Sequence, residues 1–370
     1  MGRNVCILLP RVGVYPELGA MMAEAFAGLG WQATVHHRAQ RDMLGADLLL
    51  LAGLCRYIEA LPEVLSRRGG PRRPMTVLWQ LEPLPPVQLS DAGEASGFRV
   101  AACDWGRLPR RPRQALSYLV PFRTRLLRLA RRWLARPYSG QVLREPDQQG
   151  WKVFDVENFF NASADWRWIK SAHGRGWLDF CFASGQPRVQ FLRSRGIRAD
   201  LLPFGYHPRW GRDLQRPRDV DVLFLGQKDG GPRGLALGRL REELGRRGCP
   251  LTLVRRAHGT AREQLLSRAR ITVNLLRAPH DLAGLRVLLG LACGTLVVSE
   301  HCDGTGAFQP GKHFVMVPAT QMADTIEYYL AHEAERRQIA DEGHRFVTRE
   351  LTLANVLTKL LQQLTNRPAT

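Results

Sequence analysis

The sequence lacks several features that would place it in a common class of protein. No apolar run approaches the roughly 18 to 20 residues needed to cross a bilayer, and the run before Pro10 is too short for a signal-peptide core. The seven cysteines are scattered, without a CxxC pair or a histidine at metal-ligand spacing. We therefore expect no transmembrane segment, disulfide framework or structural zinc site, and the cysteine usage favours a cytoplasmic protein.

The composition that remains is that of a folded globular protein. Of the 370 residues, 45% are hydrophobic and 24% are charged, which is not the balance of a disordered chain. A chain of this length exceeds one ordinary hydrophobic core. Two domains of middling size are therefore expected.

The formal charge of +19 is unevenly distributed. Residues 1–104 carry ten basic and ten acidic side chains, residues 105–150 carry eleven arginines against two acids, and residues 151–370 carry 32 basic and 22 acidic side chains. Within the basic region 105–150, residues 114–136 interleave Leu, Phe and Trp with arginines, a pattern typical of an amphipathic helix at an anionic membrane, although Pro121 would kink it. The simpler interpretation, which we weigh ahead of the membrane, is an arginine-rich helical segment that covers the cleft or packs on the first domain. Nucleic acid is the lesser alternative, because no recognition motif accompanies the charge.

Apolar strands alternate with helices along the first part of the chain. Strands are predicted at 4–10, 31–37, 46–53, 74–81, 97–103, 178–184 and 199–205, and helices at 16–30 and 58–70 and around 165–170. Near-continuous apolar strands alternating with helices predict a parallel sheet covered on both faces.

The same alternation returns in the second part, after a linker rich in Pro, Arg and Gly near 203–218. Strands are predicted at 219–226, 251–256, 271–277, 295–300 and 314–318, and helices at about 233–247, at 261–269, through Ala292 and over 320–347. The predicted fold class is α/β, with two Rossmann-like doubly wound domains facing a cleft. We expect an N-terminal domain at 1–205 with a basic insertion at about 105–150, a C-terminal domain at 206–350, and a helix at 351–370 that returns to the N-terminal domain.

Two loops at the ends of strands are candidate ligand sites, because open parallel sheets bind ligands beyond the carboxyl ends of their strands. Gly13 follows the first strand of the chain, where it could serve a turn as well as a ligand. Gly226 and Lys228 follow the first strand of the second domain, and Arg233 lies at the start of the next helix. Free N–H groups at a helix start, together with two cations, suit a diphosphate, although a plain solvated loop is the alternative. The loop is neither GxGxxG nor a P-loop, so ATP hydrolysis and dinucleotide binding gain no support.

The segment LRVLLGLACGTLVVSE at 285–300, followed by Phe308 and by Pro-Gly-Lys at 310–312, resembles a known signature. It is similar to the C-terminal domain of nucleotide-sugar glycosyltransferases with the GT-B architecture of two Rossmann-like domains. Within the large group 1 superfamily, the resemblance is closest to the CgeB-like branch, named for spore-maturation proteins. It extends from about Asp219 to Thr352 and is weaker in the N-terminal half.

The resemblance implies roles for specific residues. Many members carry two glutamates separated by seven residues, the first contacting the donor sugar and the second the ribose. Asp281 and Leu289 occupy these positions here; Asp281 keeps a carboxylate, whereas Leu289 cannot hydrogen-bond ribose. The donor-binding residues that we predict are Gly13, Gly226, Lys228, Arg233, Asp281, Arg286 and Glu300. The predicted catalytic residues are Asp281 and, on the acceptor side, Glu82, for which an exposed loop carboxylate is the alternative.

The function implied is glycosyl transfer from a nucleotide-sugar to an acceptor hydroxyl, with retention of configuration and without a metal or cofactor. The expected acceptor is lipid-linked or a saccharide, and the expected location is the cytoplasm, peripheral to the inner membrane face. The alternative is a catalytically silent GT-B binding or scaffold protein, which Leu289 favours. A transferase acting on nucleic acid is the lesser alternative.

Overall fold

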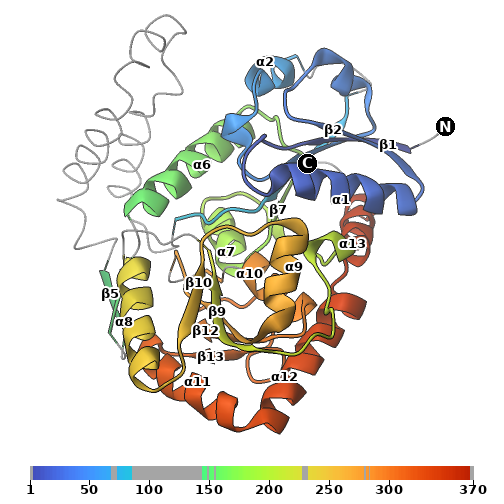
Figure 1. The fold of residues 1–370 in the computed structure, drawn as a ribbon. Helices are drawn as coiled ribbons and strands as arrows, with labels where there is room; N and C mark the ends of the chain where they lie inside the picture. The colour runs from blue at the N-terminus through green and yellow to red at the C-terminus, as the bar shows by residue number, and fades with distance from the viewer. Residues whose placement is uncertain are drawn as a thin grey trace, which may run out of the picture.

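The computed structural model describes residues 3–67, 73–85, 144–147, 150–153, 156–226, 232–278, 281–282 and 284–366. The strand expected at 97–103, the amphipathic segment at 114–136 and Lys228 lie outside these residues. Figure 1 shows two α/β domains, the N-terminal one in blue and green above and the C-terminal one in yellow to red below. None of the described helices is both long enough and apolar enough to cross a membrane.

The N-terminal domain is built on a sheet of six parallel strands in the order β2-β1-β3-β4-β7-β8. These strands are β1 (Arg3–Leu8), β2 (Trp31–His36), β3 (Leu48–Ala52), β4 (Met75–Gln80), β7 (Phe180–Ala183) and β8 (Ala199–Leu201). Its helices are α1 (Tyr15–Gly28), α2 (Leu61–Leu65), α6 (Val156–Gly174) and α7 (Gln186–Ser194). Strand β3 is buried along its whole length, with Leu48 and Leu50 in one apolar cluster and Leu49 and Leu51 in another. The sheet is therefore covered on both faces, as its continuous apolar strands predict.

The C-terminal domain repeats this plan with five parallel strands in the order β10-β9-β11-β12-β13. These strands are β9 (Val220–Leu225), β10 (Leu251–Val254), β11 (Ala269–Asn274), β12 (Leu296–Glu300) and β13 (Val315–Val317). Its helices are α8 (Pro232–Arg246), α9 (Gly259–Arg268), α10 (Gly284–Ala292), α11 (Met322–Ala331) and α12 (Glu333–Arg345). A separate antiparallel hairpin joins β5 (Arg144–Asp147) to β6 (Gly150–Val153). The predicted α/β class with two doubly wound domains is confirmed.

The strand order fixes where each domain can bind a ligand. In each sheet the second strand of the chain lies on one side of the first strand, and the third strand lies on the other side. The strand order therefore reverses between β1 and β3 in the N-terminal sheet and between β9 and β11 in the C-terminal sheet. Loops diverge at such a reversal and leave a crevice beyond the carboxyl ends of the strands. Gly13 follows β1, and Gly226 follows β9. The two crevices are therefore the places where the fold can hold a ligand.

One predicted helix is much shorter than expected. The segment predicted as a helix over 58–70 forms α2 only from Leu61 to Leu65. Ala60 has a positive φ of 58°, and Pro62 stands in the first helical turn. A left-handed residue cannot continue a right-handed helix, so the helix begins after Ala60.

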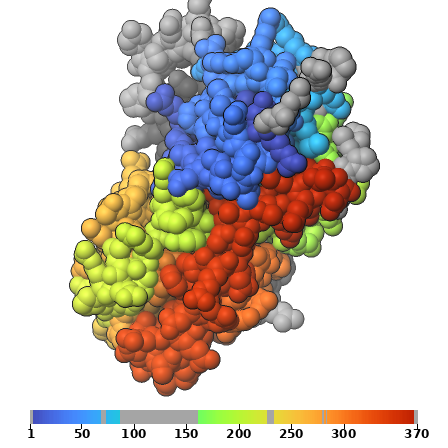
Figure 2. Space-filling model, turned by 90° about the vertical axis from the view of Figure 1, so that its right-hand side faces the viewer, coloured from blue at the N-terminus to red at the C-terminus, as the bar shows by residue number. Residues whose placement is uncertain are grey.

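The last helix joins the two domains. Helix α13 (Leu353–Thr365) leaves the C-terminal domain and packs against α1, and Figure 2 shows the red C-terminal segment lying against the blue N-terminal domain. Two backbone hydrogen bonds mark the crossing, from Tyr206 N to Leu351 O at 2.7 Å and from Leu353 N to Tyr206 O at 2.6 Å. Leucines of α13 belong to an apolar cluster that also contains Met22 of α1 and Leu291 of α10. The domains therefore share a hydrophobic core.

Candidate functional site

A cleft of about 650 Å³ lies between the two domains. It is formed where the loops after β1 and β4 face the loops after β9, β10 and β11. Five residues predicted from the sequence line it: Gly13, Glu82, Gly226, Asp281 and Arg286. The fold thus brings together residues that lie more than 250 positions apart in the chain.

The other predicted residues lie elsewhere. The Arg233 side chain is buried beside β9, its guanidinium 5.9 Å from the centre of the Phe224 ring, and it is not among the described residues that line the cleft. Glu300 accepts a hydrogen bond from Leu276 N at 3.1 Å, so it supports the loop after β11. Lys228 is outside the described residues.

The cleft is strongly basic. Among its described lining residues, six arginines stand against the two carboxylates of Glu82 and Asp281; the arginines are Arg188, Arg255, Arg256, Arg262, Arg277 and Arg286. Helix α9 begins at the cleft, and no side chain of the described residues caps it. Uncapped helix N-termini present free N–H groups and positive dipole ends. The site is therefore suited to an anion such as a diphosphate.

Arg286 is held rigidly on the floor of the cleft. Its Nη1 donates to Asn274 Oδ1 at 2.8 Å and to Leu275 O at 3.1 Å, and its Nε donates to Leu225 O at 3.3 Å. A Cβ added at Gly226 would come within 3.2 Å of Arg286 Nη2. Glycine at this position therefore lets the backbone lie close to a pre-oriented guanidinium, a group whose hydrogen bonds to anions are charge-assisted and strong.

Asp281 pairs with an arginine of the other domain. Its Oδ2 accepts from Arg188 Nε at 2.6 Å, and both side chains are at most 5% exposed. Arg188, on α7 of the N-terminal domain, also donates to Leu81 O and Ser184 Oγ. Asp281 Oδ1 has no hydrogen-bond partner among the residues that the structure describes. The ion pair therefore bridges the domains and leaves one buried carboxylate oxygen with unused accepting capacity.

Glu82 is oriented by a tyrosine. The Tyr15 hydroxyl donates to Glu82 Oε1 at 2.6 Å. Burial, and then the nearby Glu82 carboxylate, raise the pKa of Tyr15 well above its usual value, so the phenol keeps its proton. Gly53 makes room for the ring, because a Cβ there would lie 2.1 Å from Tyr15 Cε1. Glu82 is therefore a positioned carboxylate at the cleft, not a freely exposed loop residue.

Sequence reasoning missed much of the cleft. Arg188, Arg255, Arg256 and Arg262 were not predicted, although each lies at the start of a helix or just beyond a strand. That position beyond a strand or at a helix start was the signal from which these arginines could have been predicted as cleft residues. Leu289, at the position where the resemblance calls for an acid, does line the cleft.

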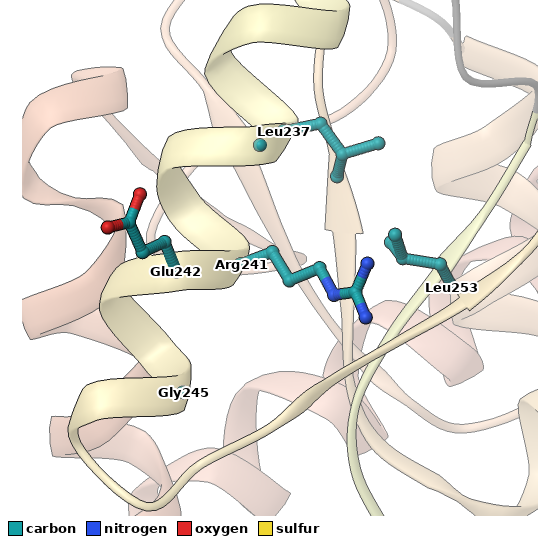
Figure 3. Close-up of a pocket in the computed structure, with 6 residues that line it drawn as sticks. Leu237, Arg241, Glu242, Gly245 and Leu253 are labelled. Carbon is teal, nitrogen blue, oxygen red and sulfur yellow. The ribbon is translucent and has the colours of Figure 1, made fainter.

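A smaller cavity of about 280 Å³ lies on the flank of the C-terminal domain, between α8 and β10. Figure 3 shows Arg241 pointing across it towards Leu253, while Glu242 points away. Among its described lining residues, Arg241 and Glu242 are the two that carry charge. In the described part of the chain, no group of three or more His, Cys, Asp or Glu side chains could hold a metal ion.

Residues 240–362 match the model of a family described as glycosyl transferase-like. The match covers most of the C-terminal domain. No curated protein matches the chain.

The fold of the whole chain is similar to those of solved glycosyltransferase structures. Sucrose-phosphate synthase from Thermosynechococcus elongatus is 14% identical, with 98% of this chain and 99% of that chain covered and a TM-score of 0.54. HepE from Anabaena, whose crystal structure holds UDP and glucose, is 13% identical, with 99% and 100% covered and a TM-score of 0.50. The predicted resemblance to GT-B glycosyltransferases is confirmed, and the CgeB-like branch stays a prediction.

Proposed function

We propose that this protein is a glycosyltransferase that moves a sugar from a nucleoside diphosphate donor to an acceptor hydroxyl. One observation carries the proposal: an arginine-lined cleft lies at the strand reversals of both domains, beside a segment that matches the glycosyl transferase-like family. Breaking the bond between the sugar and the diphosphate leaves negative charge on the leaving group. Fixed cations and helix N-termini stabilise that charge without reorganising.

The diphosphate would bind between Arg286 and the start of α9. Arg286 lies next to Gly226 in the cleft, and the exposed Arg255 and Arg256 follow β10 on the way to α9. These groups supply positive charge from two sides of the cleft. The role assigned to them is neutralisation of the leaving diphosphate by protein cations, with no metal ion and no cofactor proposed.

The two carboxylates of the cleft would bind the sugar and the acceptor. Asp281 Oδ1 would accept a hydrogen bond from a hydroxyl of the donor sugar, since a buried carboxylate oxygen gains from such a partner. Glu82, held by Tyr15, would orient the acceptor hydroxyl from the N-terminal side. Transfer with retention of configuration is the stereochemical outcome proposed, on the resemblance alone.

Titration calorimetry of the full chain tests donor binding. The panel consists of UDP-, GDP-, ADP- and dTDP-sugars, with UDP-sugars first because HepE was crystallised with UDP. Arg286→Ala should weaken binding at least about tenfold, since a charge-assisted hydrogen bond is lost. Arg241→Ala, in the cavity of Figure 3, is the matched control and should bind as the wild type does. If the whole panel fails to bind, the proposed function is wrong.

A catalytically silent binding protein is the second candidate, and Leu289 is the observation that favours it. A half-buried leucine in the cleft wall cannot accept a hydrogen bond from ribose. This candidate would be supported if the protein bound the donor but showed neither sugar transfer nor slow hydrolysis of the donor. Leu289→Glu should tighten nucleoside diphosphate binding if the ribose lies against α10, and unchanged affinity would place the ribose elsewhere.

The acceptor is proposed to be a saccharide or a lipid-linked molecule, with the basic region 105–150 at an anionic membrane surface. Each basic residue near acidic lipid contributes about 1 kcal/mol, weakened by salt. The protein should then sediment with anionic vesicles at low salt and not with neutral ones. Replacing Arg125, Arg128, Arg131 and Arg132 by Gln should reduce this binding and leave donor affinity unchanged. Equal sedimentation of variant and wild type would contradict the membrane role.

A further inference from the structure

A second arginine-lined cavity, of about 450 Å³, lies at the opposite end of the C-terminal sheet from the cleft. It includes Arg270 near the start of β11 and Gly294 just before β12, so it lies at the amino ends of the strands. The remaining walls are the interdomain linker at 213–218 and helix α12. The proposed donor and acceptor sites do not use this cavity.

Positive charge exceeds negative charge in this cavity. Its described lining holds five arginines and three carboxylates: Arg216, Arg218, Arg270, Arg336 and Arg337 against Asp213, Glu333 and Asp341. Two of the carboxylates already have partners, because Asp213 Oδ2 accepts from Arg218 at 3.1 Å and Glu333 Oε1 lies 2.6 Å from Arg337. Asp341 is exposed at the rim. Arg270 also pairs outside the lining, with Asp221 Oδ1 at 3.0 Å, which leaves an excess of one positive charge and suits an anion.

Among the described arginines that line the cavity, Arg336 is the one whose buried positive charge lacks a close partner. It is 2% exposed, yet its two contacts are long: Nη1 lies 3.4 Å from Arg270 O, and Nη2 lies 3.6 Å from Glu333 Oε1. Its Nε has no hydrogen-bond partner within the described ranges. Burial, and then the nearby Arg270, lower the pKa of Arg336. A buried charge is costly unless it is paired and hydrogen-bonded, so this guanidinium would gain from an anion in the cavity.

The cavity walls are held in place from several sides. Arg218 Nη1 donates to Ala269 O at 2.7 Å, and Nη2 donates to Cys293 O at 3.0 Å. A Cβ added at Gly294 would come within 2.7 Å of Asp213 Oδ2, so only glycine lets the linker pack this closely. Arg216 on the linker and Arg337 on α12 are exposed at the rim. The floor of the cavity is therefore preformed, and the long side chains of Arg216 and Arg337 lie at its entrance.

We propose that this cavity is a binding site for a phosphate-class anion, held between the interdomain linker and α12. Arg336 lies beneath the ligand, and Arg216 and Arg337 donate to it from the rim. The site is separate from the donor cleft and does not depend on the proposed function.

The test is titration of inorganic phosphate into the full chain, followed by calorimetry and by thermal unfolding. The double variant Arg216→Gln/Arg337→Gln keeps both side-chain stems and leaves the buried Arg336 in place. It should bind phosphate at least about tenfold more weakly than the wild type, since two charge-assisted hydrogen bonds are lost. Arg241→Gln is the matched control, an exposed arginine in the cavity of Figure 3, and should bind as the wild type does.

A second variant separates this site from the cleft. Arg286→Ala, which alters the proposed donor site, should retain phosphate binding. UMP is also titrated into Arg286→Ala. Tighter binding of UMP than of phosphate would identify a nucleotide phosphate as the ligand, and tighter binding of phosphate would identify free phosphate. The proposal is wrong if the wild type does not bind phosphate. It is also wrong if Arg286→Ala abolishes binding while Arg216→Gln/Arg337→Gln keeps it, because the phosphate would then occupy the cleft.

Discussion

At the scale of single residues, the cleft depends on charged side chains that are buried with particular partners. Asp281 is held by Arg188 from the other domain, and Arg262 of α9 donates to Glu17 of α1 at 3.2 Å. Both pairs join the two domains across the cleft. Breaking a buried pair is costly, because the remaining partner stays buried without compensation. The residues proposed to bind ligand here therefore also contribute to stability, and the two effects have to be measured separately.

Asp281→Ala should lower the free energy of unfolding by about 3 kcal/mol, because Arg188 is left buried without its counter-charge. Urea denaturation monitored by fluorescence measures this effect. Asp200→Ala is the matched control: its pair with Arg193, at 3.0 Å, has a half-exposed arginine, and the loss should be under about 1 kcal/mol. Equal losses for the two variants would mean that the interdomain pair is not specifically stabilising.

His313 should make stability depend on pH. It is 2% exposed, and its Nδ1 accepts a hydrogen bond from Gln309 N at 3.2 Å. Burial, and then the neighbouring Lys312, lower the pKa of His313. A lowered pKa means that the unfolded state binds the proton first, so stability is present above about pH 6.5 and is lost as the pH falls below it.

His313→Gln should reduce the loss of stability between pH 7.5 and 5.5, by at most about 1.4 kcal/mol per pH unit. Glutamine can still accept from Gln309 N, so the variant should fold. Some pH dependence should remain, because the pKa of His207 is also lowered, by burial first. Urea unfolding at several pH values measures the slope, and an unchanged slope would show that His313 does not titrate in this range.

At the scale of elements, the sequence was most informative where local pattern decides the structure. Strand β3 is a continuous apolar run and β12 begins with one, Leu296 to Val298, and the burial of these residues follows from that pattern alone. Helix α2 was predicted too long, because the left-handed turn at Ala60 has no strong local signal. Asp281 was predicted from its motif, but its partner Arg188 lies 93 positions away and meets it only through domain docking. The cavity at the linker could not be predicted either, since it joins segments distant in sequence.

Gly205 packs directly against the backbone at the start of α13. A Cβ at this position would lie 2.5 Å from Leu353 Cα, between backbone segments that cannot easily separate. Gly205→Ala should therefore cost about 1–3 kcal/mol of stability. Gly238→Ala is the control: this exposed glycine within α8 has nothing within 4 Å of an added Cβ, so alanine should stabilise by about 0.5–1 kcal/mol. Thermal unfolding of both variants measures the difference, and a neutral Gly205→Ala would contradict the close packing.

At the scale of the whole molecule, helix α13 joins the hydrophobic cores of the two domains. The apolar cluster that contains Leu360 also contains core residues of both sheets, Ile7 of β1 and Val297 of β12 among them. The backbone hydrogen bonds at Tyr206 and the two interdomain ion pairs also hold the two domains together. A cleft between domains joined in this way has a defined width, which positions groups on opposite walls for a ligand.

Leu360→Ala should therefore destabilise both domains together. Leu360 is fully buried, and truncating such a leucine costs about 2–5 kcal/mol, depending on how far the cavity collapses. Because the cavity opens in a core shared by both sheets, hydrogen exchange should accelerate in β3 and in β12 to a similar degree. Leu235→Ala, in an exposed position on α8, should change neither. If exchange accelerates only in β3, the domains unfold independently, and the ion pairs across the cleft rather than α13 set its width.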